Sequence, residues 1–226
     1  RLLREENPDS IVLTAGDLLL AVQDIHGQIW SVQTIQPSGA KLFAAGSRKE
    51  SNFHIVGNNG QGLDAAINTA PAIVIAEGYA TADTLSQALD YPVIAAFDSG
   101  NLSKVAQDLH EKYPHKLIII TGDDDHHLES TIGKNPGKEK ALEAAALVYG
   151  SAVFPVFAPS ERDSKKLNDF NDLANKSALG IEAVKRQVGS VVEKISQQAK
   201  QDSLLKLQVP IEPKQQEIKQ KRALVR

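Results

Sequence analysis

Two short apolar runs that end in acidic residues constrain this chain more than any other feature. Leu117–Ile120 has the length and composition of a buried strand, and a short turn leads from it into three consecutive aspartates, Asp123–Asp125. A second apolar run, Ala72–Ala76, ends in Glu77. Because ligands of open α/β sheets bind at the carboxyl ends of the strands, both runs predict carboxylates at one edge of a sheet. Neighbouring carboxylates repel one another, and a hard divalent cation such as Mg2+ or Mn2+ relieves that repulsion.

The middle of the chain alternates between strand and helix patterns. This alternation predicts an α/β fold with a parallel sheet and right-handed crossovers, flanked by helices. The predicted strands are 72–76, 93–97, 117–120 and 152–157, and the predicted helices are 81–88, 101–112 and 138–149.

The flanking regions have different patterns. The start is β-rich, with apolar runs at 18–24 and 28–35 on either side of a hairpin-like break and two shorter runs at 40–45 and 52–56. After the alternating region, a Val/Ile stripe predicts a further helix, and the residues beyond it are basic with little apolar content. We therefore expect a small β-rich N-terminal subdomain at 1–65, a catalytic domain at 66–176, a C-terminal helix at 177–202 and a basic flexible tail at 203–226.

Composition excludes several classes of function. The formal net charge of −3 argues against a chain that is basic throughout, so any contact with a polyanion needs a local basic patch. The absence of cysteine excludes disulfides, thiolate nucleophiles and cysteine-based zinc sites. No apolar run has the roughly 20 residues of a membrane helix, and no signal peptide is visible, so we expect a cytoplasmic protein. Methionine is absent even at position 1, from which we expect either a processed product or, preferably, a fragment of a larger protein.

The order of these motifs resembles the Toprim domain of bacterial-type primases, topoisomerases and some nucleases. In that family a Glu-Gly pair closes one strand and an Asp-x-Asp motif closes a later one; Glu77-Gly78 matches the first, and Asp123 and Asp125 match the second. Gly137–Ala141 resembles the segment that follows Asp-x-Asp in primases, and Asn168–Leu173 resembles a later acidic segment.

The β-rich start is similar to the primase branch of the family. Leu20–Trp30 resembles a primase run that precedes a basic segment, here Gly46–Lys49. The amino-acid sequences of these motifs most resemble those of plasmid and conjugative-element primases. The chain departs from the family at Thr81, where an acid is common, and through an inserted segment at 126–134.

The resemblance implies DNA-template-directed RNA primer synthesis by metal-dependent nucleotidyl transfer. The implied partners are a single-stranded DNA template, nucleoside triphosphates and the missing flanking domains of a parent conjugative or replication protein. Two alternatives stay open, a Toprim nuclease that hydrolyses phosphodiesters and a non-catalytic module that binds DNA or partners.

The resemblance also implies roles for particular residues. Catalysis would rest on Glu77, Asp123 and Asp125, and Mg2+ or Mn2+ would be held by these three with Asp169 and Asp172. Nucleic acid or nucleotide would contact Arg48, Lys49, Lys138 and Lys140. Each group also has a plainer interpretation: helix capping for the aspartates, a solvated hairpin tip for the first basic pair and a charged helix face for the second.

Several other residues lie close to these motifs. We expect Asp124 to point away from its neighbours, His126 and His127 to be exposed, and Asn101 to cap a helix. Trp30 lies among strand residues, and we expect it in the core instead of serving as a base-stacking platform.

Overall fold

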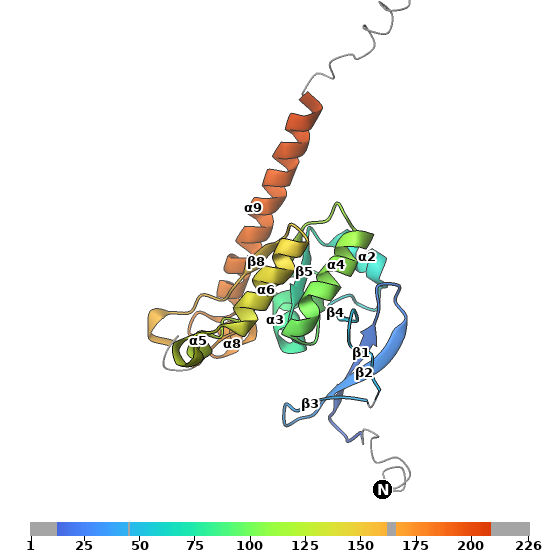
Figure 1. Cartoon of the computed structure of the whole chain (residues 1–226), viewed down its shortest axis with the longest axis vertical. Helices are drawn as coiled ribbons and strands as arrows, with labels where there is room; N and C mark the ends of the chain where they lie inside the picture. The colour runs from blue at the N-terminus through green and yellow to red at the C-terminus, as the bar shows by residue number, and fades with distance from the viewer. Residues whose placement is uncertain (1–12, 45, 162–165, 209–226) are drawn as a thin grey trace, which may run out of the picture.

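The computed structural model describes residues 13–44, 46–161 and 166–208, and within them the strands form two sheets (Figure 1). The smaller sheet is antiparallel and contains β1 (Leu18–Gln23), β2 (Ile29–Ile35) and β3 (Lys41–Phe43) in that order. The larger sheet has five strands in the order β4-β6-β5-β7-β8. Helices cover both of its faces, so the expected α/β class is confirmed.

The larger sheet is parallel except at one edge. β5 (Ile73–Ala76) pairs in parallel with β6 (Val93–Ala95) and with β7 (Ile118–Thr121), and β8 (Ser151–Val153) continues the parallel order beside β7. β4 (His54–Val56) runs antiparallel to β6. The sequence pattern predicts this strand within the β-rich subdomain, but it belongs to the larger sheet, and Ile55 and Val56 are both buried, as expected for a strand covered on its two faces.

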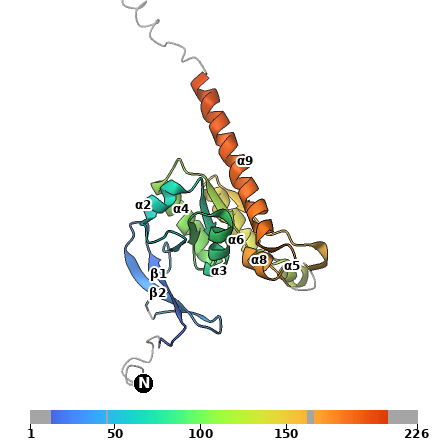
Figure 2. The ribbon, with the colours of Figure 1, turned by 180° about the vertical axis from the view of Figure 1, so that it is seen from behind.

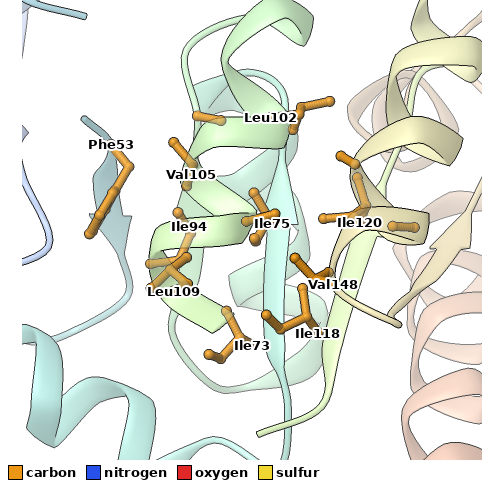
Figure 3. Packing of buried hydrophobic residues seen from close by; sticks show 14 of the residues in the cluster. Phe53, Ile73, Ile75, Ile94, Leu102, Val105, Leu109, Ile118, Ile120 and Val148 are labelled. Atoms are coloured by element: carbon orange, nitrogen blue, oxygen red, sulfur yellow. The ribbon is translucent and has the colours of Figure 1, made fainter. Parts of the chain in front are cut away.

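Side chains of the sheet alternate between two apolar cores. On one face, Ile73, Ile75, Ile118 and Ile120 pack against three helices (Figure 3). These helices are α2 (Leu63–Thr69), α4 (Leu102–Lys112) and α6 (Pro136–Leu147). On the other face, the intervening residues of the strands pack against α3 (Tyr79–Leu89), α8 (Phe170–Asn175) and α9 (Gly180–Gln208). The period of two in the strands therefore fixes which side chains each helix covers.

The smaller sheet joins the larger one through β1 and the residue before β4. Gln23 forms an antiparallel bridge with Phe53, which is fully buried. The rings of Phe43 on β3 and Phe97 after β6 meet edge to face, with centroids 5.4 Å apart. These contacts hold the smaller sheet over the carboxyl ends of the parallel strands.

Element boundaries differ from the sequence predictions where local chemistry intervenes. β8 ends at Val153 because Pro155 follows and cannot donate to a sheet ladder. α5 (His126–Ile132) lies in the inserted segment and buries none of its residues, which explains why apolar periodicity did not predict it. α9 continues to Gln208, six residues past the boundary expected at 202, while the remainder of the expected tail, 209–226, lies outside the described residues.

α9 leaves the layered body on the side away from the smaller sheet, as Figures 1 and 2 show. Its first half carries Val184, Val188 and Val192, which are buried against the sheet's second core. No helix in the described ranges is long and apolar enough to cross a membrane.

Gly122 is required where β7 turns toward α6. A Cβ at this position would lie 2.4 Å from Ala141 Cβ and 2.6 Å from Phe154 Cε1. We expect Gly122→Ala to lower the free energy of unfolding by about 1–3 kcal/mol, as is usual for overpacking. The measurement is urea unfolding followed by circular dichroism.

Gly189→Ala is the matched control for that substitution. Gly189 lies inside α9, where an added Cβ would meet nothing closer than Leu89 Cδ2 at 3.8 Å. Alanine is the better helix former, so this variant should be as stable as the wild type or up to about 1 kcal/mol more stable. An equal decrease in the free energy of unfolding of both variants would contradict the close packing around Gly122.

Candidate functional site at the carboxyl edge of the sheet

Acidic residues follow three adjacent parallel strands at the same edge of the sheet. In the β5–β7 ladder, Ala76 pairs with Thr121, so Glu77 and Gly122 continue side by side beyond the last pair. Asp123–Asp125 follow directly, and Asp98 comes after neighbouring β6. The structure thus brings Glu77, Asp123 and Asp125 together, as the sequence predicts.

The carboxylates at this edge destabilise one another's charged forms. Burial raises the pKa of Asp123 to about 8, and the negative charges of Glu77, Asp169 and Asp125 add to that effect. Burial also raises the pKa of Glu77, with Asp125 and Asp98 contributing further. At neutral pH and without a cation, the site therefore favours a protonated Asp123.

Asp125 is held in place by donors from two segments. Its Oδ1 accepts a hydrogen bond from Asn168 Nδ2 at 2.9 Å, and its Oδ2 accepts one from the backbone N of Gly137 at 3.0 Å. Gly137 lies in the first turn of α6, where backbone N–H groups stabilise an anion. A Cβ on Gly137 would lie 2.8 Å from Asp123 O, so only glycine lets this helix approach so closely.

Asp124 has a structural role between the two candidate ligands. It is 8% exposed, and its Oδ1 accepts a hydrogen bond from Asn135 Nδ2 at 2.8 Å. The Oδ1 of the same asparagine accepts from the backbone N of Asp125 at 2.9 Å. Asn135 therefore fixes the loop that carries all three aspartates.

The two later aspartates lie in different surroundings. Asp169 caps α8 by accepting from the backbone N of Asp172 at 2.6 Å, and Thr81 also donates to it. Burial is the main cause that raises the pKa of Asp169, and its charge in turn acts on Asp123. Asp172 instead pairs through Oδ1 with Lys176 Nζ at 2.6 Å. Asp169 thus belongs electrostatically to the acid site, whereas Asp172 pairs with Lys176 and acts on the site through Asp169.

The acids are not arranged as a closed metal cage. Among the residues that the structure describes, no three His, Asp or Glu side chains form a metal-binding cluster. The donor chemistry nevertheless fits a hard cation, because Glu77 and Asp123 offer only oxygen atoms, and burial together with neighbouring negative charges raises the pKa of both. His126 and His127 are half-buried, not exposed as expected, and their ring centroids lie 6.1 Å apart.

The basic segment before β4 is anchored to the same edge of the sheet. Asn101 was expected to cap a helix, but it is buried, and its Nδ2 donates to the carbonyls of Lys49 and Asn52 at 3.1 and 2.8 Å. Asn101 stands at the N-cap position of α4 but makes no side-chain capping bond there, while Asp98 caps the preceding 3₁₀ helix η1 (Ser99–Asn101) and also pairs with Lys49 Nζ. The interactions place Lys49 beside the acid site and Arg48 next to it along the chain.

The second basic pair is placed less favourably. Lys138 Nζ lies 5.6 Å from the centroid of the Phe154 ring, and its backbone N donates to Asn135 Oδ1. Lys140 makes an ion pair with Glu143 at 2.7 Å on the exposed side of α6. The start of this helix is already occupied by the Asp125 carboxylate.

Sequence reasoning missed Lys41. Its Nζ lies 3.5 Å from the point that a Cβ on Gly78 would occupy. Its positive charge offsets part of the rise in the pKa values of Glu77 and Asp123. Lys41 is therefore the cation that β3 supplies to the acid site. The alternation of Lys41 and Phe43 on one strand face was a signal, but the sequence did not show what that face covers.

Trp30 lies in a different environment from the expected core. The residue is 51% exposed, and its indole N donates to Asp24 Oδ2 at 2.8 Å. The expectation was wrong because β2 belongs to a three-stranded sheet whose outer face stays exposed at Leu19, Val32 and Leu42.

Comparison with known proteins identifies the class of this domain. The Toprim domain family matches residues 72–178, which contain the acid site, so this part of the chain is a Toprim domain. The chain is also similar to two proteins called DNA primase TraC from Escherichia coli, at 41% identity over 79% of the chain and 39% identity over 88% of it. It spans only 16% and 24% of the length of those relatives.

A solved structure has a similar fold. The DnaG primase catalytic domain bound to single-stranded DNA matches with a TM-score of 0.50 and 17% identity, over 77% of this chain and 51% of that one. At this level of identity the match concerns the fold alone.

The raised pKa of Asp123 predicts how stability depends on pH. Its folded-state pKa of about 8 exceeds the ordinary 3.8, so between these values the folded state binds more protons and stability falls as pH rises. Asp123→Asn removes this loss. Without divalent cations, we expect its melting temperature to exceed that of the wild type by at least about 5 °C at pH 8 and by less at pH 5.5.

Asp90→Asn is the matched control for the stability measurement. Asp90 is exposed at the left-handed C-cap of α3, a conformation that asparagine also tolerates. Its melting temperature should follow the wild type at both pH values. A constant difference between Asp123→Asn and the wild type across this pH range would contradict the proposed titration.

Proposed function

We propose that this chain is the metal-dependent nucleotidyl-transfer core of a plasmid-type primase, which synthesises RNA primers on a DNA template. The observation that carries this proposal is the meeting of Glu77 and Asp123 at the ends of paired strands, with both pKa values raised. The similarity to DNA primases supports the choice of reaction. Because the chain spans a minor part of those proteins, their activity is proposed for it and not transferred.

The reaction is an in-line displacement at phosphorus. The 3′-hydroxyl oxygen of the growing primer forms a bond to the α-phosphorus of a nucleoside triphosphate, and the bond from that phosphorus to the bridging oxygen breaks to release pyrophosphate. When bound, Mg2+ or Mn2+ supplies positive charge that stabilises the attacking and leaving oxygens. Positioning and electrostatics provide most of the rate enhancement in such transfers.

The carboxylates would have different roles in this reaction. Glu77, Asp123 and Asp125 would hold the cation, and Asp125 is already oriented by Asn168 and Gly137. Alternatively, Glu77 would act as the general base that accepts the proton of the 3′-hydroxyl, since a raised pKa makes it a better base. Asp169, whose charge acts on Asp123, is the better placed of the two later acids to recruit a cation carried by the nucleotide.

Basic residues around the acids would bind the phosphates of both substrates. Lys41, whose Nζ lies close to Gly78, would bind the triphosphate. Arg48 and Lys49 would bind the backbone of single-stranded DNA; Asn101 donates to the Lys49 carbonyl and Asn52 to the Arg48 carbonyl. Lys138 is nearer than Lys140 to the start of α6, so it is the stronger candidate of that pair.

Primer synthesis by the full chain tests the proposal directly. The protein is incubated with single-stranded DNA, labelled nucleoside triphosphates and Mg2+ or Mn2+, and the products are separated on a denaturing gel. We expect wild-type protein to make primers. Glu77→Gln and Asp123→Asn should each lower the rate by more than about 100-fold, the size of effect seen when one electrostatic contact to a transition state is lost.

Asp90→Asn serves again as the control, because it removes one acid far from the sheet edge and should keep wild-type activity. Cleavage of the template without primers would show a nuclease instead. Primer synthesis at the wild-type rate by either site variant would contradict the assigned roles.

A further inference from the structure

We infer that Trp30 and Arg48 form a stacking site for an unpaired base of single-stranded DNA, beside the acid site; this inference rests on the proposed function. The Arg48 guanidinium carbon lies 5.4 Å from the centroid of the Trp30 ring. With the arginine in this position, Trp30 is still 51% exposed. Roughly half of a large aromatic surface therefore remains free to contact another flat group.

The indole is oriented before any ligand arrives. Its N–H donates to Asp24 Oδ2 at 2.8 Å. The other oxygen of Asp24 accepts from the backbone N atoms of His26 and Gln28 at 2.8 and 3.0 Å, so the turn after β1 fixes the carboxylate. A ring that is already held in one orientation loses little entropy when a base stacks on it.

The charges around this site favour a polyanion. Arg48 forms no ion pair with any residue that the structure describes, so its charge is available to a phosphate. The whole chain carries a net charge of −3, which makes this local basic position distinctive. Aromatic rings combined with arginine are a common means of binding unpaired bases irrespective of sequence.

The loop also connects the stacking site to the acid site. Lys49 follows Arg48 and pairs with Asp98, whose charge acts on Glu77. Asn101 holds this loop against the sheet edge through the Lys49 carbonyl. A single strand that stacks on Trp30 would therefore continue along the basic loop toward the carboxylates.

The chain's single tryptophan makes the test direct, because all indole fluorescence comes from Trp30. The full chain is titrated with a short dT oligonucleotide in the absence of nucleoside triphosphates. We expect saturable quenching of this fluorescence. An abasic oligonucleotide of the same length keeps the phosphates but lacks the bases, and it should bind with little quenching.

Variants provide a second readout, the anisotropy of a labelled dT oligonucleotide. Trp30→Ala should weaken binding about 5- to 100-fold, the range reported for loss of one base–aromatic stack. Trp30→Phe should retain most of the affinity, whereas Trp30→Leu, which is apolar but has no π face, should behave like the alanine variant. Melting curves confirm that each variant is folded, and the wild-type quenching experiment needs no variant at all.

The results separate this inference from the proposed function. Binding without quenching, equal quenching by the abasic strand, or equal affinity of the folded leucine and phenylalanine variants would overturn the stacking site. Base-dependent quenching by a protein that makes no primers would leave the stacking site in place and overturn the primase proposal. Primer synthesis without base-dependent quenching would support the primase proposal and overturn the stacking site.

Discussion

The parallel pairing of β5 with β7 is the constraint on which the site depends. Every side chain of these two strands is buried, and they alternate between two separate cores. A slip of one residue would move each side chain into the wrong core, so packing holds the register firmly. That register places Glu77 and Asp123 beyond paired residues, where their mutual repulsion cannot be avoided. Because the fold brings these carboxylates together, a positive charge at this edge would stabilise it.

A layer of amides and backbone groups around the acids keeps the loop in one conformation. Asn135 bonds to Asp124 and to the backbone of Asp125, and Asn168 bonds to the Asp125 carboxylate. Asn168 is itself tied through its backbone N to Asp172 at 3.3 Å. Asn168–Leu173, the segment that resembles the late acidic segment of primases, thus orients Asp125. Asp172 takes part in this positioning through Asn168, besides any contact with a cation.

The acid site was predictable because it depends on local patterns. A buried strand followed by acids is visible in the sequence, and parallel order follows from the alternation of strands and helices. Thr81 looked like a departure from the family, yet in the structure it donates to Asp169 and so takes part in the same site. The sequence shows which residue stands at Thr81 but not which carboxylate its side chain reaches.

The residues that were misjudged depend on contacts between distant segments. Asn101 follows a strand as a capping residue does, but the loop at 49–52 occupies its side chain. Lys41 and Trp30 lie on strands whose pattern gives alternation without saying which face is covered. β4 has too few residues for its pattern to choose between two sheets. Tertiary packing determines where these residues lie, and the sequence pattern of a single segment carries no information about that packing.

The central claim is that Glu77 and Asp123 act together on one divalent cation. Calorimetric titration of Mn2+ into the full chain at pH 8 tests it without any requirement for activity. We expect saturable binding by the wild type and by Asp90→Asn, and an affinity at least about tenfold weaker in both Glu77→Gln and Asp123→Asn. Wild-type affinity for Mn2+ in either of these two variants would contradict the shared site.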